Sequence, residues 1–280
     1  MLRAYFFGSS EFAVPSLREA AHRTDLRGVV TQPDRPSGRG HRLLATPVKQ
    51  AALELGVPVF EPLSLRDFFA EHSAEALDLI ALASYGRILP KALLAWPRLG
   101  ALNVHPSLLP QYRGATPIQS ALREGAVETG LSVMLMDEGM DTGPLVAQER
   151  LAIGAHESFG ELHDRLAVLG ARMLGEAIGS AVGGELRATP QVGEPTVTHP
   201  LHKEDLIVDL SWPAQRLIAA VRAFSPSPLA RALVDGEQVK IVRAHLADGR
   251  FAIDELIAPN RGPMSWERYL QLRAAGGDRR

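Results

Sequence analysis

Asn103 and His105 are the two residues of this sequence whose types and spacing best suit chemistry. They follow the short apolar run 99–102, which predicts the entry into a buried strand, and side chains two apart on a strand project to the same side. A carboxamide would then stand beside an imidazole at the carboxyl end of a strand. An amide donor next to a titratable ring suits the polarisation of a carbonyl group and the movement of a proton. The alternative is a strand-end histidine that is simply hydrogen-bonded at the surface.

A second candidate is Asp141, which lies in an acidic, glycine-rich turn of residues 137–144. Strand-like sequence on both sides of the turn predicts a hairpin that carries Asp141 at its tip. The turn lacks the spacing of a calcium-binding loop because Gly139 stands where an oxygen ligand is needed, so we predict no metal. The alternative is that Asp141 serves only to form the turn.

The elements that must position these residues read as an α/β domain. Residues 2–7 predict a buried first strand, Gly8 a turn, and residues 12–21 a helix. Residues 78–86 form a near-continuous apolar run, as is typical of a parallel strand buried on both faces. This order predicts a doubly wound sheet, which binds ligands at the carboxyl ends of its strands. Only the first glycine of the dinucleotide-binding fingerprint is in place, so we predict no nicotinamide cofactor.

Composition narrows the class of protein further. The 280 residues suffice for one large domain or two smaller ones, and the absence of cysteine excludes thiolate catalysis and cysteine-ligated zinc. With a formal net charge of −2, contact with nucleic acid must depend on a local basic patch. No apolar run is long enough for a signal peptide or a membrane span, so we expect a cytoplasmic protein without a membrane partner.

Residues 103–114 resemble the signature of the folate-dependent formyltransferases; they read Asn-Val-His-Pro-Ser-Leu-Leu-Pro-Gln-Tyr-Arg-Gly. The turn of residues 137–144 resembles the second motif of that family, with Asp141 at the position of the catalytic aspartate. The resemblance implies a Rossmann-like catalytic domain that uses 10-formyltetrahydrofolate as co-substrate and needs no metal. Asn103 and His105 would donate hydrogen bonds to the oxyanion that forms when an amine attacks the formyl carbon. Asp141 would hold His105 charged and oriented and would help to move the proton.

The same resemblance assigns a second group of residues to the folate. The loop after the strand would shape the folate pocket, through Ser107, Leu108, Leu109 and Pro110. The segment after the central strand would line an apolar pocket for the pterin ring, through Ile88 and Leu89. These last two residues could instead belong to the hydrophobic core.

Residues 32–43 contain two prolines and two glycines, which predicts a loop without regular structure. The loop has one acid, Asp34, and carries the basic residues Arg35, Arg39 and Arg42. It could be a solvated surface loop, but an arginine-rich loop can also order itself on a phosphate backbone. The segment resembles the loop that methionyl-tRNA formyltransferases insert after the second strand. That resemblance implies that the three arginines bind tRNA and that the acceptor is the α-amino group of charged initiator tRNA.

The end of the chain resembles the C-terminal domain of the same branch, an OB-like barrel. We expect a catalytic domain at 1–188, a linker at 189–204 and a shortened, truncated OB-like domain at 205–280, because residues 244–257 are too few for that domain's usual strands. We expect a monomer. Two alternatives remain: a formyltransferase acting on an amino-sugar nucleotide, and a non-catalytic protein that binds folate or RNA. The basic loop argues against the first, and the coincidence of two catalytic motifs argues against the second.

Overall fold

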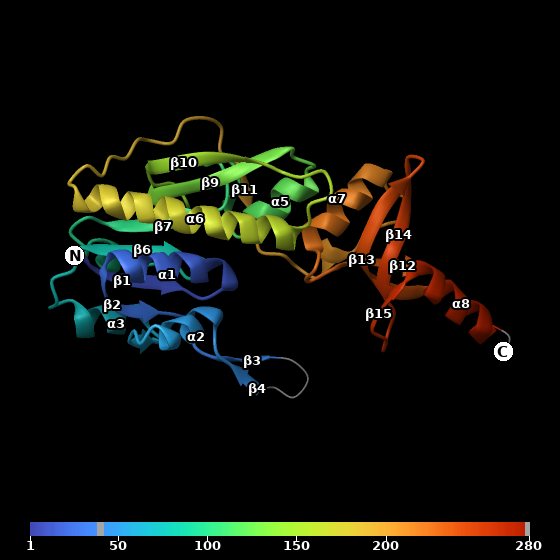
Figure 1. The fold of residues 1–280 in the computed structure, drawn as a ribbon, viewed down its shortest axis with the longest axis horizontal. Helices are drawn as coiled ribbons and strands as arrows, with labels where there is room; N and C mark the ends of the chain where they lie inside the picture. Colours follow the sequence, from blue (N-terminus) through green and yellow to red (C-terminus); the bar gives the residue numbers. More distant parts are fainter. Residues whose placement is uncertain (38–41, 278–280) are drawn as a thin grey trace. The chain divides into compact units, whose positions relative to one another are not determined.

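A computed structural model describes residues 1–37 and 42–277 of the chain, which divides into two compact units (Figure 1). The first unit comprises Met1–Ala115, Gly130–Leu151 and Asp164–Val197; the second comprises Thr116–Thr129, Ala152–His163 and Thr198–Arg280. Within the described residues, no helix combines the length and the apolar composition that crossing a membrane requires.

The first unit is built on a seven-stranded sheet with the strand order β10-β9-β7-β6-β1-β2-β5. Strands β5, β2, β1, β6 and β7 are neighbours in this order and run parallel. Strand β9 runs antiparallel to β7. The chain moves outward from β1 to β5 and then returns to β6 and β7 on the other side of β1. This order confirms the predicted doubly wound fold, and its reversal between β1 and β6 marks the edge where such sheets bind ligands. The strands are β1 (Arg3–Gly8), β2 (Asp25–Val30), β5 (Val59–Phe60), β6 (Leu79–Ala83), β7 (Ala101–His105), β9 (Glu128–Leu135) and β10 (Leu145–Ala152).

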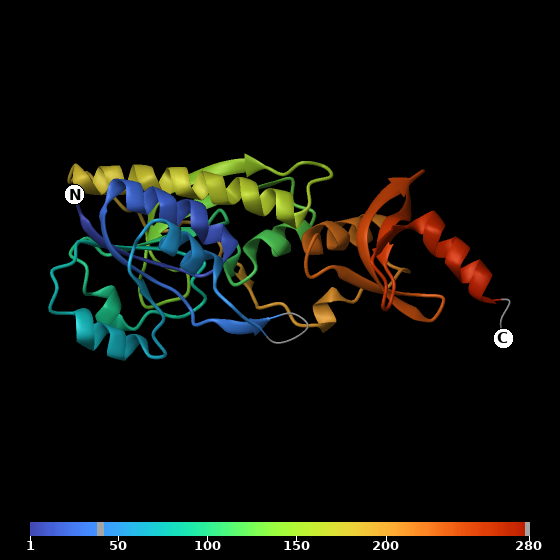
Figure 2. The same cartoon turned by 60° about the horizontal axis from the view of Figure 1, so that its bottom comes forward.

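Helices cover both faces of this sheet. Side chains alternate along β1, so Tyr5 and Phe7 enter one apolar cluster with Phe68 of α3 and lie beside Leu93 of α4. Helices α1 and α6 lie side by side on the sheet (Figure 2). Burial on both faces explains why the strands of this unit read as apolar runs. The helices are α1 (Val14–Arg23), α2 (Pro47–Glu54), α3 (Leu65–His72), α4 (Lys91–Leu94) and α6 (Phe159–Val182).

Residues 32–43 correct one prediction, because they contain regular structure. Strand β3 (Arg35–Ser37) pairs antiparallel with β4 (Arg42–Leu44), and Pro36 stands opposite Leu43. A two-stranded ribbon has an open edge on each side, so a proline there can direct its missing N–H away from the partner strand. The proline and glycine content of the segment therefore led the prediction to miss two short paired strands. Arg39 lies outside the described residues.

The second unit contains a four-stranded antiparallel sheet with the order β12-β13-β14-β15. Phe224 of α7 is fully buried in this unit, as are Val239 and Ile241 of β13. The expected smaller C-terminal β-domain is therefore present. Its elements are α5 (Pro117–Arg123), α7 (Ala214–Phe224), β12 (Ala230–Val234), β13 (Glu237–Ala247), β14 (Arg250–Ile257), β15 (Pro263–Ser265) and α8 (Trp266–Gly277).

Two glycines of α6 give a matched test of how this helix packs on the sheet. A Cβ at Gly170 would lie 2.7 Å from Val104 Cγ1 and 3.0 Å from Leu131 Cδ1, whereas a Cβ at Gly179 would meet nothing within 4 Å. We expect Gly170→Ala to lower the free energy of unfolding by about 1–3 kcal/mol through overpacking. Gly179→Ala should raise it by about 0.5–1 kcal/mol, because alanine loses less backbone entropy in a helix. Urea unfolding curves of the two variants would decide, and equal shifts would contradict this packing.

Candidate active site

The carboxyl end of β7 presents Asn103 and His105, which are only 6% and 5% exposed. In the register of the sheet, Asn103 pairs with Leu82 of β6 on one side and with Met134 of β9 on the other. Strand alternation places the two side chains on the same face, as predicted. Within residues 1–37 and 42–277, the Asn103 carboxamide makes no hydrogen bond. Its donors are therefore available to a ligand at the edge of the sheet.

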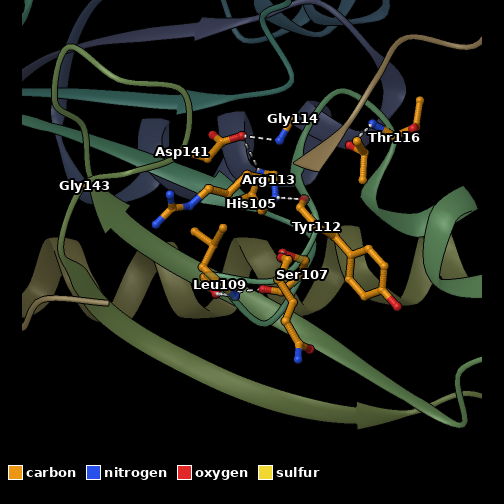
Figure 3. Close-up of polar contacts among 12 residues, drawn as sticks. His105, Ser107, Leu109, Tyr112, Arg113, Gly114, Thr116, Asp141 and Gly143 are labelled. Carbon is orange, nitrogen blue, oxygen red and sulfur yellow. Dashed lines mark hydrogen bonds and ion pairs between the residues drawn. The ribbon is translucent and has the colours of Figure 1, made fainter. Parts of the chain in front are cut away.

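His105 is held with a defined tautomer. Its Nε2 lies 3.0 Å from the carbonyl oxygen of Tyr112 (Figure 3). A carbonyl can only accept, so Nε2 carries a proton and donates to it. Nδ1 is then the nitrogen that gains and loses the second proton, and it lies 3.6 Å from Asp141 Oδ2. That separation exceeds a hydrogen bond but gives an ion pair when the ring is protonated.

Asp141 approaches His105 from the turn between β9 and β10. Its Oδ2 accepts a hydrogen bond of 2.8 Å from the backbone N–H of Gly114, and its side chain is 15% exposed. The turn itself is shaped by another acid, Asp137, whose Oδ1 accepts bonds from Gly139 N and Thr142 Oγ1. The Asp141 carboxylate is therefore not used to form the turn, and it points toward His105 and Gly114 (Figure 3).

Three non-glycine residues around this edge have left-handed backbones: Ser84, Tyr112 and Asp141, with φ of 44°, 56° and 54°. Such conformations cost on the order of 1–3 kcal/mol each and persist only where the surroundings over-determine them. Tyr112 supplies the carbonyl that binds His105, and Asp141 supplies the carboxylate. Ser84 follows β6 directly, beside the end of β7. Backbone strain is therefore concentrated where the candidate catalytic groups meet.

A buried serine, Ser132 of β9, holds the loop of residues 107–110. Its hydroxyl donates to the Ser107 carbonyl at 2.7 Å, and it accepts from the Leu109 N–H at 3.2 Å. Gln148 of β10 donates to the same hydroxyl at 3.0 Å and to the Leu109 carbonyl at 2.9 Å. The residues predicted to shape the folate pocket, Leu108 and Pro110 among them, thus lie on a loop that is fixed from the antiparallel side of the sheet.

The segment after β6 splits the predicted pterin-binding pair. Ile88 is 87% exposed, whereas Leu89 is 3% exposed and belongs to the apolar cluster under α3 and α4. Arg87 fixes the segment by donating from its guanidinium to the carbonyls of Pro62 and Leu63. Burial raises the pKa of the neighbouring Tyr85 phenol, which therefore stays neutral. An exposed isoleucine at this edge offers apolar surface to a ligand.

Two of the three predicted tRNA-binding arginines, Arg35 and Arg42, lie on strands other than β7, which carries Asn103 and His105. Arg35 is on β3 and Arg42 on β4, on facing strands of the hairpin. The only acid of the segment, Asp34, pairs with Lys49 Nζ at 2.9 Å, and this hydrogen bond lowers the pKa of Asp34. The one acid beside the arginines is therefore neutralised by an ion pair with Lys49.

Sequence reasoning did not identify Ser132, Gln148 or Gln191, although each contacts the loops of the site. Ser132 gave a weak signal, as a lone polar residue inside an apolar strand. Gln148 and Gln191 gave none, since a glutamine in a polar strand or in a connector with proline and glycine reads as surface. Chemically, the assembled groups supply hydrogen-bond donors and a proton-transfer pair. Among the described residues, no group of three or more histidine or acidic side chains could hold a metal ion.

The chain matches the formyl transferase family over residues 6–178 and the C-terminal domain of formyl transferases over residues 200–269. It therefore belongs to the formyl transferase family. A relative from Xanthomonas axonopodis pv. citri, named methionyl-tRNA formyltransferase, is 47% identical and aligns with 86% of this chain and 80% of its own. A relative of the same name from Xylella fastidiosa is 45% identical, over 88% and 82% of the two chains. The structure of a methionyl-tRNA formyltransferase from Clostridium thermocellum shares the fold, with a TM-score of 0.61, 15% identity and coverage of 92% and 100%.

Ser132→Ala tests how the loop of residues 107–110 is held. The substitution leaves the Leu109 N–H and the Gln148 amide without their shared acceptor, and an unsatisfied buried donor costs about 1–3 kcal/mol. We expect the free energy of unfolding to fall by that amount and the affinity for folate to weaken. Ser180→Ala, at an exposed position of α6, is the matched control. Chemical denaturation and folate titration provide the two measurements, and unchanged folate binding in Ser132→Ala would contradict the assigned role of the loop.

Proposed function

We propose that this protein transfers the formyl group of 10-formyltetrahydrofolate to the α-amino group of methionine on charged initiator tRNA. The observation that carries the proposal is the convergence of Asn103, His105 and Asp141 at the carboxyl edge of the sheet in a chain 47% identical to a methionyl-tRNA formyltransferase. The open carboxamide and the exposed Ile88 at the same edge suit a ligand with a carbonyl group and an apolar ring.

In the proposed reaction the amine attacks the formyl carbon, the bond from that carbon to the folate nitrogen breaks, and the amine proton ends on that nitrogen. Negative charge develops on the formyl oxygen, and the Asn103 amide is placed to donate to it. His105 can exchange a proton with the substrate only through Nδ1, because Nε2 donates to the Tyr112 carbonyl. Asp141 lies on that same edge and stabilises the protonated ring. The pair can therefore take up and return a proton without moving the backbone.

The acceptor is the finer part of the proposal. A sugar 3N-formyl transferase also shares the fold, with a TM-score of 0.66 over 89% of this chain and 87% of that one, but it is only 16% identical. The two relatives reported above, at 47% and 45% identity, carry the methionyl-tRNA name. The arginines of residues 32–43 suit a phosphate backbone better than a single small amine. These observations favour charged tRNA.

Tetrahydrofolate release should be measured with three acceptors in parallel: methionyl initiator tRNA, the same tRNA uncharged, and an amino-sugar nucleotide. We expect turnover with the charged tRNA alone. Turnover with the sugar nucleotide would assign the protein to that other branch of the family. The absence of release with all three acceptors would leave a folate- or RNA-binding role.

Asn103→Ala and Asp141→Asn test the assignment of the catalytic groups. Removing one donor to a developing oxyanion lowers the turnover number about a hundredfold to a thousandfold, and we expect a loss of that size for Asn103→Ala. Asp141→Asn keeps an oxygen for the Gly114 N–H but removes the charge beside His105, so we expect a similar loss. Circular dichroism should show unchanged folding. A folded double variant that retains turnover would refute the assignment.

Arg39→Ala and Arg42→Ala test the basic segment. Each phosphate contact that is removed should weaken the binding of charged tRNA and lower the slope of log affinity against log salt by about one. Turnover at saturating tRNA should remain. Filter binding at several salt concentrations gives the slope, with Arg268→Ala on α8 as a charge-matched control. An unchanged slope in both loop variants would make the segment an ordinary surface hairpin.

A further inference from the structure

Residues 189–197 run across both loops that form the active site, although their sequence reads as a connector. Thr189 exchanges both backbone hydrogen bonds with Leu145, at 2.8 and 2.9 Å, immediately after the turn that carries Asp141. At the other end, Thr196 accepts the Arg113 N–H at 2.9 Å and, through Oγ1, the Tyr112 N–H at 2.8 Å. The segment is therefore anchored to the strand that leaves the Asp141 turn, to Tyr112, which contacts His105, and to Arg113, which precedes Gly114.

Between these anchors, Gln191 joins the two loops through its side chain. Its Nε2 donates to the carbonyls of Asp141 and Gly143, both at 2.8 Å. Its Oε1 accepts from the guanidinium of Arg113, at 2.7 Å from Nη2 and 3.2 Å from Nε. The part-buried Gln191 amide therefore uses its two N–H donors on the backbone of the Asp141 turn. Its oxygen accepts from the Arg113 side chain of the other loop.

We propose that Gln191 is a positioning residue that fixes the Asp141 carboxylate for proton transfer. Arg113 immediately precedes Gly114, whose N–H binds Asp141 Oδ2. The contacts therefore close a ring, from Gln191 through the Asp141 backbone to its carboxylate, then to Gly114 and back through Arg113. Such a ring sets the distance from Asp141 Oδ2 to His105 Nδ1, although Gln191 itself contacts neither atom.

The backbone around Asp141 explains why this support is needed. Asp141 has a left-handed conformation, which an unsupported turn would relax. Gly143 allows no side chain, because a Cβ there would lie 1.8 Å from the Leu135 carbonyl oxygen. The amide of Gln191 binds the carbonyls of these two residues, on both sides of Thr142. Displacement of a catalytic group by about 1 Å can cost a hundredfold in rate, so loss of this clamp should act on the chemical step.

Gln191→Glu separates positioning from a purely structural role. The substitution keeps an oxygen for Arg113 and adds a favourable charge, but it replaces the amide donors with an oxygen that faces two carbonyls. If Gln191 served only to satisfy Arg113, Gln191→Glu would be tolerated. If the donors hold the Asp141 turn, Gln191→Glu should be at least as impaired as Gln191→Ala. Gln50→Glu is the matched control, because the Gln50 amide donates to the Ala45 carbonyl at 3.4 Å outside the site.

The kinetic test rests on the proposed function. We expect Gln191→Glu and Gln191→Ala to lower the turnover number with methionyl-tRNA about tenfold to a hundredfold, with KM for both substrates within about twofold. Gln50→Glu should match the wild type. A turnover number for Gln191→Glu within about twofold of the wild type, or a rise in KM alone, would overturn the proposal.

A second measurement does not depend on activity. The Gly114 amide is protected from hydrogen exchange by its bond to Asp141 Oδ2, so exchange at Gly114 should accelerate in both Gln191 variants and not in Gln50→Glu. Unchanged exchange at Gly114 in the Gln191 variants would overturn the positioning role. If the wild type formed no formylmethionyl-tRNA, the proposed function would fail, and the exchange result would still decide the role of Gln191.

Discussion

The hydrogen bond from His105 Nε2 to the Tyr112 carbonyl determines how the candidate active site is arranged. It makes Nε2 a hydrogen-bond donor and leaves Nδ1 on the edge that Asp141 faces. Tyr112 supplies that carbonyl from a left-handed backbone, which the Thr196 side chain stabilises through the Tyr112 N–H. The chemistry of the imidazole therefore depends on a tertiary contact more than eighty residues away in the sequence.

The sheet supplies the second constraint. Strand β7 lies between a parallel neighbour and an antiparallel one, so its carboxyl end meets both the end of β6 and the antiparallel strand β9. The parallel side brings the strained Ser84 and the segment with Ile88. The antiparallel side brings Ser132, which fixes the loop of residues 107–110, and the turn that carries Asp141. An all-parallel sheet would have placed a helix where that turn now reaches the histidine.

Local patterns were enough to predict the doubly wound sheet and the shared face of Asn103 and His105, because apolar runs and strand alternation are encoded over a few residues. The approach of Asp141 to His105 could be anticipated only from the resemblance, since no local rule joins two loops across a sheet. Gln191 was invisible for the same reason: its four contacts are all distant in sequence. The pairing of β3 with β4 was missed because propensity counts proline against pairing, although an open ribbon tolerates Pro36.

All the groups assigned to the chemistry lie in the first unit, and so does the hairpin that carries Arg35 and Arg42. The segment 189–197 also belongs to that unit, and the chain enters the second unit directly after it, at Thr198. Its first part binds the Asp141 turn through Gln191, and its last part binds Tyr112 and Arg113 through Thr196. The contacts that hold the Asp141 turn and Tyr112 therefore come from the last segment of the first unit.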